Sequence, residues 1–205
     1  MSSSPSYLDP VVLPLIVGET VLDAACGLGR WGALLETNYW EAGLAAPPVV
    51  DGFDAFEANV ERCRSRGYYR DVWRHELPDP LPRVWDTVLA VELLEHLRPE
   101  DVEGALDALE AAATRRVICT TPSFPCLRPG LDSPVGFNDY EAHLGYVAAE
   151  TFSRRGYRLR GAGFGRPTSP FVRVANRLRL GPAFAGLPRA FPTLGLSIVA
   201  VKDIA

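Results

Sequence analysis

The stretch VLDAACGLGRWG, which begins at Val21, constrains the fold of this chain more than any other. An apolar pair leads into the acid Asp23, glycines follow at Gly27 and Gly29, and the next residues can start a helix. This order is typical of the first strand, tight turn and first helix of an α/β sheet, because glycine lets the backbone approach a ligand closely. The stretch therefore predicts a ligand-binding loop at the end of a first strand.

The acid at Asp23 narrows the choice of ligand for this loop. A carboxylate one turn before the glycines would repel a pyrophosphate, whereas it would attract the positive sulfonium of an amino-acid ligand. Loop and acid together favour S-adenosylmethionine (SAM) over NAD as the adenosine-containing ligand.

The composition is that of one globular domain, residues 1–205, with a sizeable core, since 47% of the residues are hydrophobic. No apolar run approaches the roughly 18 residues that span a bilayer. The first residues, MSSSP, do not resemble a secretory signal. The four cysteines form no CxxC pair and do not cluster with the three histidines. We therefore expect reduced thiols, no metal ion and a cytoplasmic protein.

Positive charge is concentrated at the C-terminal end. Residues 1–150 hold 24 acids against 11 Lys and Arg, whereas residues 151–205 hold ten Lys and Arg against Asp203 alone. Nine of these ten cations are arginines, which suit phosphate or carboxylate groups. Two interpretations stay open: this end faces an anionic acceptor or a membrane surface, or its charges are solvated or pair with the acidic body.

Strands and helices are expected to alternate over the first 120 residues, which predicts a doubly wound, mostly parallel sheet. Apolar runs between turn residues predict strands at Thr20–Ala24, Val49–Phe53, Tyr69–Trp73, Thr87–Val91, Arg116–Thr121, Tyr157–Phe164 and Leu196–Lys202. Helical spacing predicts helices at Arg30–Thr37, Phe56–Arg66, Glu100–Ala113, Tyr146–Arg155 and Phe171–Leu180. The last two strands have no clear crossover between them and should form an antiparallel edge. The proline-containing segments Leu8–Val17 and Ser123–Leu144 are expected to be irregular.

Acids at the ends of the second and third expected strands are candidates for contacts to a nucleoside. Asp54 ends the second strand, where a carboxylate accepts hydrogen bonds from both ribose hydroxyls. Asp51 and Glu57 compete for this role, but the strand-end position favours Asp54. Glu76 follows the third strand and could reach the adenine amino group, with Asp79 as the alternative.

The fourth expected strand runs into VELLEHL at residues 91–97. Together with VLDAACGLGRWG, the GFD that ends at Asp54 and the TTP that ends at Pro122, this segment resembles the class I SAM-dependent methyltransferases. The closest resemblance is to the broad bacterial and archaeal group that methylates small molecules or has unknown substrates. It covers about residues 15–165 and implies a seven-stranded Rossmann-like sheet whose last strand is inserted antiparallel.

The resemblance also implies a cofactor site. The residues expected around the methionine portion of SAM are Asp23, Cys26, Gly27 and Gly29. Asp54 takes the ribose, and the cofactor is bordered by Ala90, Val91 and Glu92. The family usually has Gly-x-Gly-x-Gly, and Ala25, which we count with the cofactor-binding residues, replaces the first glycine. Alanine costs little there only if the backbone is not left-handed.

Three residues are candidates for catalysis, namely Glu92, His96 and His143. Glu92, Glu95 and His96 cluster after the fourth strand, but a zinc motif of the HExxH type needs two histidines, so no metal is expected. Glu92 or His96 is either a substrate-side base or polar group, or Glu95 and His96 only orient the loop. His143 lies where such folds place the acceptor, as a general base or as a tether of the loop.

We therefore expect a methyltransferase that moves a methyl group from SAM to an oxygen or nitrogen of a small molecule. The arginines would suit an anionic acceptor. A non-catalytic SAM- or lipid-binding module remains an alternative because of Ala25 and the arginines. A nicotinamide-dependent oxidoreductase is a weaker one, because it prefers GxGxxG without the upstream acid.

An Arg-rich helical insertion is expected at about residues 166–193. Its apolar residues within 169–192 suggest a lid over the acceptor, a dimer contact, a peripheral membrane helix, or a helix packed on its own sheet. No nucleic acid partner is expected, and the chain is expected to be a monomer or a homodimer.

Overall fold

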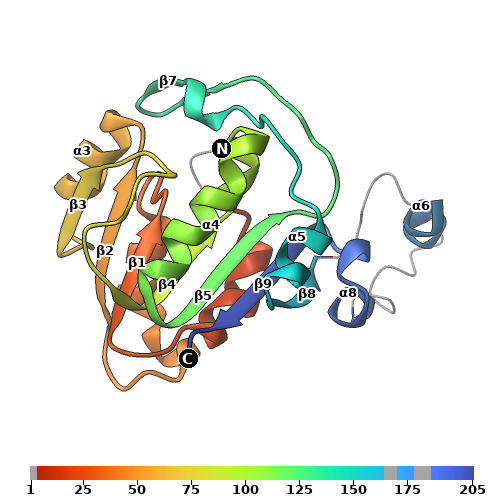
Figure 1. Ribbon diagram of the computed structural model, residues 1–205, viewed down its shortest axis with the longest axis horizontal. Coiled ribbons are helices and arrows are strands. Elements are labelled where there is room, and N and C mark those ends of the chain that lie inside the picture. The colour runs from red at the N-terminus through yellow and green to blue at the C-terminus, as the bar shows by residue number, and fades with distance from the viewer. Residues whose placement is uncertain (1–3, 164–169, 178–185) are drawn as a thin grey trace.

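The sheet is the core of the computed structural model, which describes residues 4–163, 170–177 and 186–205. Its strands are β1 (Thr20–Ala24), β2 (Val49–Asp54), β3 (Asp71–Arg74), β4 (Trp85–Val91), β5 (Ala113–Pro122), β8 (Arg158–Ala162) and β9 (Ser197–Asp203). They lie in the order β3-β2-β1-β4-β5-β9-β8 (Figure 1). β9 is antiparallel to both of its neighbours, and the other neighbouring strands are parallel. The predicted seven-stranded sheet with an antiparallel last strand is confirmed.

Helices cover both faces of this sheet. They are α2 (Arg30–Asn38), α3 (Glu57–Arg66), α4 (Val102–Ala111), α5 (Ala149–Arg154), α6 (Pro170–Arg177) and α8 (Leu187–Ala190). Successive residues of β1 point to opposite faces, so Leu22 packs with α4 whereas Val21 packs with α2. Both faces of the central strands are therefore buried, which explains their continuous apolar runs.

The N-terminal segment is helical, so the prediction of an irregular Leu8–Val17 was wrong. It forms a 3₁₀ turn at Ser6–Leu8, the short helix α1 (Asp9–Val12) and a second 3₁₀ turn at Leu13–Leu15. Pro10 and Pro14 both lie in the first turn of a helix, where a missing N–H breaks no hydrogen bond. Apolar side chains of this segment are buried against the α2 face of the sheet.

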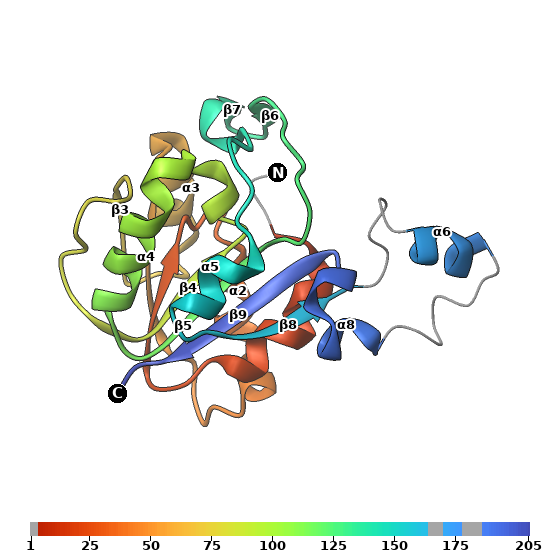
Figure 2. The ribbon, with the colours of Figure 1, turned by 45° about the vertical axis from the view of Figure 1, so that its right-hand side comes forward.

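The segment Ser123–Leu144, predicted to be irregular, contains a small hairpin. Its strands β6 (Leu131–Ser133) and β7 (Gly136–Asn138) are antiparallel and lead into a 3₁₀ turn at Asp139–Glu141. Figure 2 shows this hairpin beyond the end of the main sheet, on the side where the parallel strands end. The sequence does not reveal it because each strand is three residues long and too short for a clear alternation.

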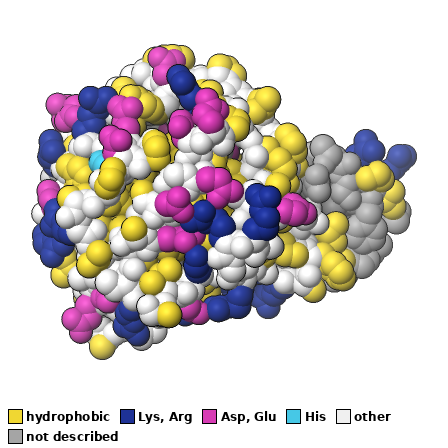
Figure 3. Space-filling model, viewed as in Figure 1, with side chains coloured by type: hydrophobic (Ala, Val, Ile, Leu, Met, Phe, Trp, Pro, Cys, Tyr) yellow, Lys and Arg dark blue, Asp and Glu magenta, His cyan; other side chains and the backbone are white. Residues whose placement is uncertain are grey.

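Several cations of the C-terminal end pair with acids of the body. The guanidinium of Arg155 contacts three carboxylates of α4, from Glu103, Asp107 and Glu110. Lys202 Nζ lies 2.6 Å from Glu110 Oε2. Figure 3 shows positive and negative side chains mixed over the middle of this face. Charge pairing thus accounts for this part of the basic end.

The helix α6 lies apart from the sheet in both ribbon views and exposes Arg173 and Arg177 (Figures 1 and 2). The residues before and after it, 164–169 and 178–185, are outside the described part of the chain, and so is the predicted end of this helix at Leu180. None of the described helices is long and apolar enough to cross a membrane.

Candidate functional site

A cavity of about 810 Å³ lies at the carboxyl ends of β1, β2 and β4. Its roof is the segment from Arg128 to Leu144, which contains the hairpin. The roof is fastened on two sides, because the Tyr140 hydroxyl donates to Glu76 Oε1 (3.0 Å) and the backbone N–H of Leu144 donates to the Glu95 carbonyl (2.9 Å). Among the described residues, none after Leu144 lines this cavity. The position of the described helix α6 therefore does not support the interpretation of this segment as a lid.

The loop after β1 forms one wall, and its backbone is left-handed at every second residue. The φ angles are +58° at Ala25, +55° at Gly27 and +80° at Gly29. This alternation explains why glycine suits all three positions. The condition under which alanine would cost little is therefore not met, and Ala25 carries a strain of about 1–2 kcal/mol. The other non-glycine residue with positive φ in the described chain, Glu92, also lies in the cavity wall. Such strain is typical of ligand sites.

Asp54, the last residue of β2, holds this loop in place from the cavity wall. Its Oδ2 accepts a hydrogen bond from the backbone N–H of Gly27 (2.8 Å), and its Oδ1 accepts from the N–H of Phe56 (2.9 Å) and from Asn59 Nδ2 (3.2 Å). Burial raises the pKa of Asp54, and these hydrogen bonds oppose the rise. A carboxylate has about four lone-pair positions, so one remains for a ligand hydroxyl.

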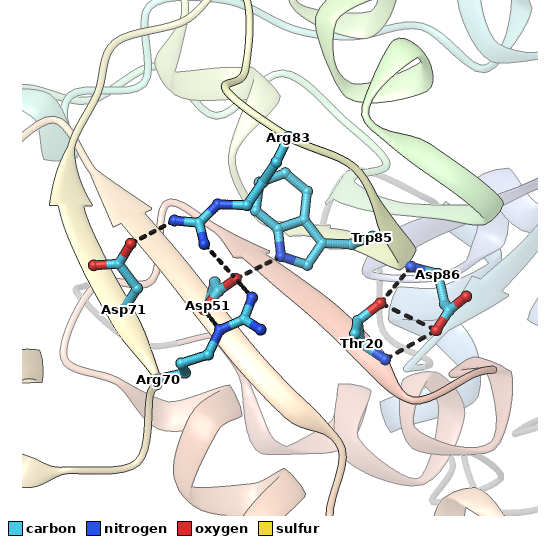
Figure 4. A network of polar contacts seen from close by, with 7 residues as sticks. All are labelled: Thr20, Asp51, Arg70, Asp71, Arg83, Trp85 and Asp86. Atoms are coloured by element: carbon cyan, nitrogen blue, oxygen red, sulfur yellow. Dashed lines mark hydrogen bonds and ion pairs between the residues drawn. The ribbon is translucent and has the colours of Figure 1, made fainter.

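The competing acids of this region do not line the cavity. Asp51 contacts the guanidinium of Arg70 (Figure 4), and Glu57 pairs with Arg64 at 3.7 Å. Glu76 does line it and accepts from Arg74 (2.5 Å) as well as from Tyr140. Asp79, the alternative to Glu76, lies outside the wall.

Three of the residues expected at the cofactor lie behind the wall, namely Asp23, Gly29 and Ala90. Asp23 Oδ2 accepts from the hydroxyl of Tyr69 (2.6 Å), which in turn accepts from the N–H of Gly32 (3.1 Å). Burial raises the pKa of Asp23 to about 7. Asp23 therefore supports the loop from behind, and its direct contact with a cofactor stays a prediction.

Sequence reasoning did not single out Trp31 and Asn59, whose buried polar atoms Nε1 and Oδ1 have no hydrogen-bond partner among the described residues. Both side chains line the cavity. Asn59 lies in the first turn after Asp54, on the side that faces it, which is the one signal the sequence offers. These atoms are free to bond to a ligand.

The three candidate catalytic residues all line the cavity. Glu92 Oε1 accepts from Thr120 Oγ1 at 2.9 Å. The rings of His96 and His143 meet edge to face, with centroids 4.7 Å apart and planes at 82°. Nδ1 of His96 lies 3.0 Å from the Ala142 carbonyl. The fold thus places the ring of His143 in contact with the ring of His96.

Burial sets the protonation state of this histidine pair. It lowers the pKa of His96, and it lowers that of His143 to about 4, helped by the neighbouring ring and by Arg128. Both rings are therefore neutral near pH 7. A base of so low a pKa holds a proton only weakly, although its lone pair remains available.

Negative charge predominates in the cavity wall. The acids that line it are Asp54, Glu76, Glu92, Glu95, Asp101, Asp139 and Glu141, and the arginines are Arg30, Arg98 and Arg128. An excess of carboxylates raises the local concentration of positively charged ligands. The wall is therefore better matched to a cation than to an anion.

Comparison with known proteins gives a clear result for structure only. No protein-family model matches the chain, and no curated protein is significantly similar to it in sequence. A SAM-dependent methyltransferase from Mesorhizobium loti is 16% identical, with a TM-score of 0.57 and a match that covers 97% of this chain and 98% of that one.

Two further solved structures agree. A magnesium protoporphyrin IX methyltransferase from Synechocystis PCC 6803, with bound S-adenosylhomocysteine (SAH), is 16% identical, covers 97% of this chain and 80% of that one, and has a TM-score of 0.55. A SAM-dependent methyltransferase from Archaeoglobus fulgidus is 17% identical, covers 96% and 91%, and has a TM-score of 0.53. The chain therefore has the Rossmann-like fold of the class I SAM-dependent methyltransferases.

Proposed function

We propose that the protein is a SAM-dependent methyltransferase that methylates an oxygen or nitrogen of a small molecule. One observation carries the proposal: the left-handed loop after β1 and the strand-end carboxylate of Asp54 meet, through the Gly27 N–H, in the wall of one large cavity. The fold supports it, since a solved structure of the same fold holds bound SAH.

In this proposal the cofactor occupies the side of the cavity formed by the loop. A ribose hydroxyl bonds to Asp54, Glu76 contacts the adenine, and Val91 and Glu92 border the ligand. The excess of acids in the wall stabilises the positive sulfonium. Trp31 Nε1, a donor without a partner in the described chain, is available to the carboxylate of the methionine portion.

The acceptor occupies the other side, beneath the hairpin and against Glu92, His96 and His143. Its oxygen or nitrogen attacks the methyl carbon, the carbon–sulfur bond breaks, and the sulfonium leaves as a neutral thioether while the acceptor loses a proton. Because SAM is already activated, the protein mainly supplies alignment, which contributes up to about 7–11 kcal/mol. His143 is the first candidate to receive the proton.

The charge of the wall bears on the acceptor's character. Of the described arginines at the C-terminal end, Arg154 and Arg155 pair with α4, Arg158 pairs with Asp203, and none lines the cavity. We infer a neutral, hydroxyl- or amine-bearing acceptor rather than an anionic one.

Calorimetric titration with SAM and with NAD tests the proposal. We expect SAM to bind. Asp54→Asn should weaken SAM binding by about 1–3 kcal/mol, because the amide N–H₂ would face one of the N–H groups from which Asp54 now accepts a hydrogen bond. Asp132→Asn, on the exposed β6, is the matched control and should bind SAM normally.

Methyl transfer from labelled SAM to a small-molecule extract then tests catalysis. Transfer supports the proposal. Tight SAM binding without transfer would favour a non-catalytic module, and binding of NAD in place of SAM would contradict the proposal.

A further inference from the structure

We propose that Glu95, His96 and His143 bind one divalent transition-metal ion on the acceptor side of the cavity. One potential ligand atom of each residue lies within 4.8 Å of those of the other two. The sequence predicts no metal because ELLEH offers one histidine where an HExxH motif needs two, and the fold brings His143 beside His96. Metal binding is independent of the proposed function, whereas the catalytic role given below rests on it.

Glu95 is the strongest sign of a missing cation. It is 1% exposed and lines the cavity, and neither of its carboxylate oxygens accepts a hydrogen bond of good geometry among the described residues, although its own backbone N–H and the Thr121 hydroxyl lie close enough to lower its pKa. An isolated buried carboxylate is costly unless it is protonated or bound to a cation. The guanidinium of Arg128 lies 3.8 Å from Glu141 Oε2, and its charge also lowers the pKa of Glu95, but it makes no hydrogen bond to that carboxylate.

The two histidines are held as metal ligands usually are. His96 Nδ1 lies 3.0 Å from the Ala142 carbonyl, which fixes the proton on Nδ1 and leaves the lone pair of Nε2 free. His143 Nδ1 lies 3.1 Å from Cys126 Sγ, and in the tautomer in which Nδ1 carries the proton and donates to the sulfur, Nε2 is free in the same way. Orientation through the second ring nitrogen is the common pattern at metal sites.

The backbone fastens the two ligand-bearing segments together. The N–H groups of Leu144 and Gly145 donate to the carbonyl of Glu95 at 2.9 and 3.2 Å, and the N–H of His143 donates to the Arg128 carbonyl at 2.9 Å. The roof is therefore tied to the 3₁₀ turn Leu94–His96 at the ligands themselves. Such a preformed set binds an ion at little conformational cost.

The donor set indicates the class of ion. Two imidazole nitrogens and one carboxylate suit Zn²⁺, Mn²⁺, Fe²⁺ or Co²⁺, whereas Mg²⁺ and Ca²⁺ prefer all-oxygen sites. Three protein ligands leave coordination positions open. We infer that an acceptor hydroxyl fills one of them.

A metal ion at this position accounts for the loss of the acceptor's proton. A metal ion lowers the pKa of a bound hydroxyl, so the proton can leave to water and the oxygen can attack the methyl carbon of SAM. His143, with Nε2 on the metal, then cannot be the base named under the proposed function, and water takes that place.

Calorimetric titration of the chelator-treated chain with Mn²⁺, Co²⁺ and Zn²⁺ tests the proposal. We expect one ion per chain, and at least about tenfold weaker binding in Glu95→Gln and in His143→Ala. His75→Ala is the matched control, because it removes the third histidine of the chain, and should bind the ion normally. The thermal unfolding midpoint should rise with metal in the wild type and not in Glu95→Gln, which also shows that the variant is folded.

The proposal is overturned if the wild type binds no ion, or if both variants bind it as the wild type does. Titration of the same samples with SAH separates the two proposals. SAH binding without metal binding would refute the metal site and leave the proposed function in place. Metal binding without SAH binding would refute the proposed function and leave the metal site in place.

Discussion

Asp51 and Glu95 are both buried carboxylates, 0% and 1% exposed, yet their surroundings are opposite. Asp51, in the middle of β2, accepts from Arg70 Nε (2.9 Å) and Trp85 Nε1 (2.8 Å), and Arg83 lies 3.8 Å away (Figure 4). Neither oxygen of Glu95 accepts a hydrogen bond of good geometry among the described residues.

The difference separates a structural acid from one that awaits a ligand. Where a carboxylate only stabilises the fold, the chain surrounds it with donors, because an unpaired buried charge is costly. Asp23 and Asp54 are intermediate cases, since the first accepts one side-chain hydrogen bond and the second accepts three in all.

The largest effect is expected from Asp51→Asn. An amide cannot pair with the charges of Arg70 and Arg83 and would place an N–H₂ group against donors at this buried position, so stability should fall by about 2–4 kcal/mol, although both arginines are themselves partly exposed. Urea unfolding measures the loss. Asp71→Asn removes an exposed partner of the same Arg83 and should cost under about 1 kcal/mol. Equal losses in both variants would remove the basis of the comparison.

Asp23→Asn should stabilise the protein in a pH-dependent way. Burial raises the pKa of Asp23 to about 7 from an ordinary value near 3.8, so wild-type stability falls as pH rises from about 4 to 7. Asparagine can still accept from Tyr69 and does not ionise. At pH 8 we expect a gain of about 1–3 kcal/mol that disappears near pH 4. The same gain at both pH values would show that charge is not its cause.

Glu95→Gln should stabilise the metal-free chain at pH 8 by about 1–2 kcal/mol. Burial, with the neighbouring Glu92, raises the pKa of Glu95 well above its usual range, so ionisation costs stability as pH rises above about 4.5. Urea unfolding with a chelator present gives the comparison with Asp51→Asn, which should move stability the other way. A loss of stability in Glu95→Gln would mean that this carboxylate is structural after all.

Ala25→Gly should give the smallest effect, a gain of about 0.5–1 kcal/mol. Glycine removes the strain of the left-handed backbone, and its greater freedom in the unfolded chain cancels part of that gain. Ala33→Gly, inside α2, is the control and should destabilise by about 1 kcal/mol. A loss at Ala25 as large as at Ala33 would contradict the strain.

The parts of the fold that the sequence predicts are those decided by local pattern. The apolar run Thr87–Val91 and the pair of late strands identify the sheet, because burial on both faces leaves a continuous apolar signature. The helical turns within Leu8–Val17 were not predicted because prolines occur both in loops and at helix starts.

The residues of the site also divide into those that the sequence predicts and those that it does not. Asp54 and the glycine loop were predictable because strand-end acids and left-handed glycines leave a mark in the sequence. The contact between His96 and His143 was not, since it depends on how the roof returns across the sheet to Glu95. Pairing over such a distance has no periodic signal.

The most direct test of this account is a crystal structure of the protein grown with SAH and Mn²⁺. The account predicts SAH with a ribose hydroxyl on Asp54 and its homocysteine end at the loop after β1. It also predicts an anomalous manganese peak among Glu95, His96 and His143. SAH bound elsewhere, or no manganese between these three residues, would contradict it.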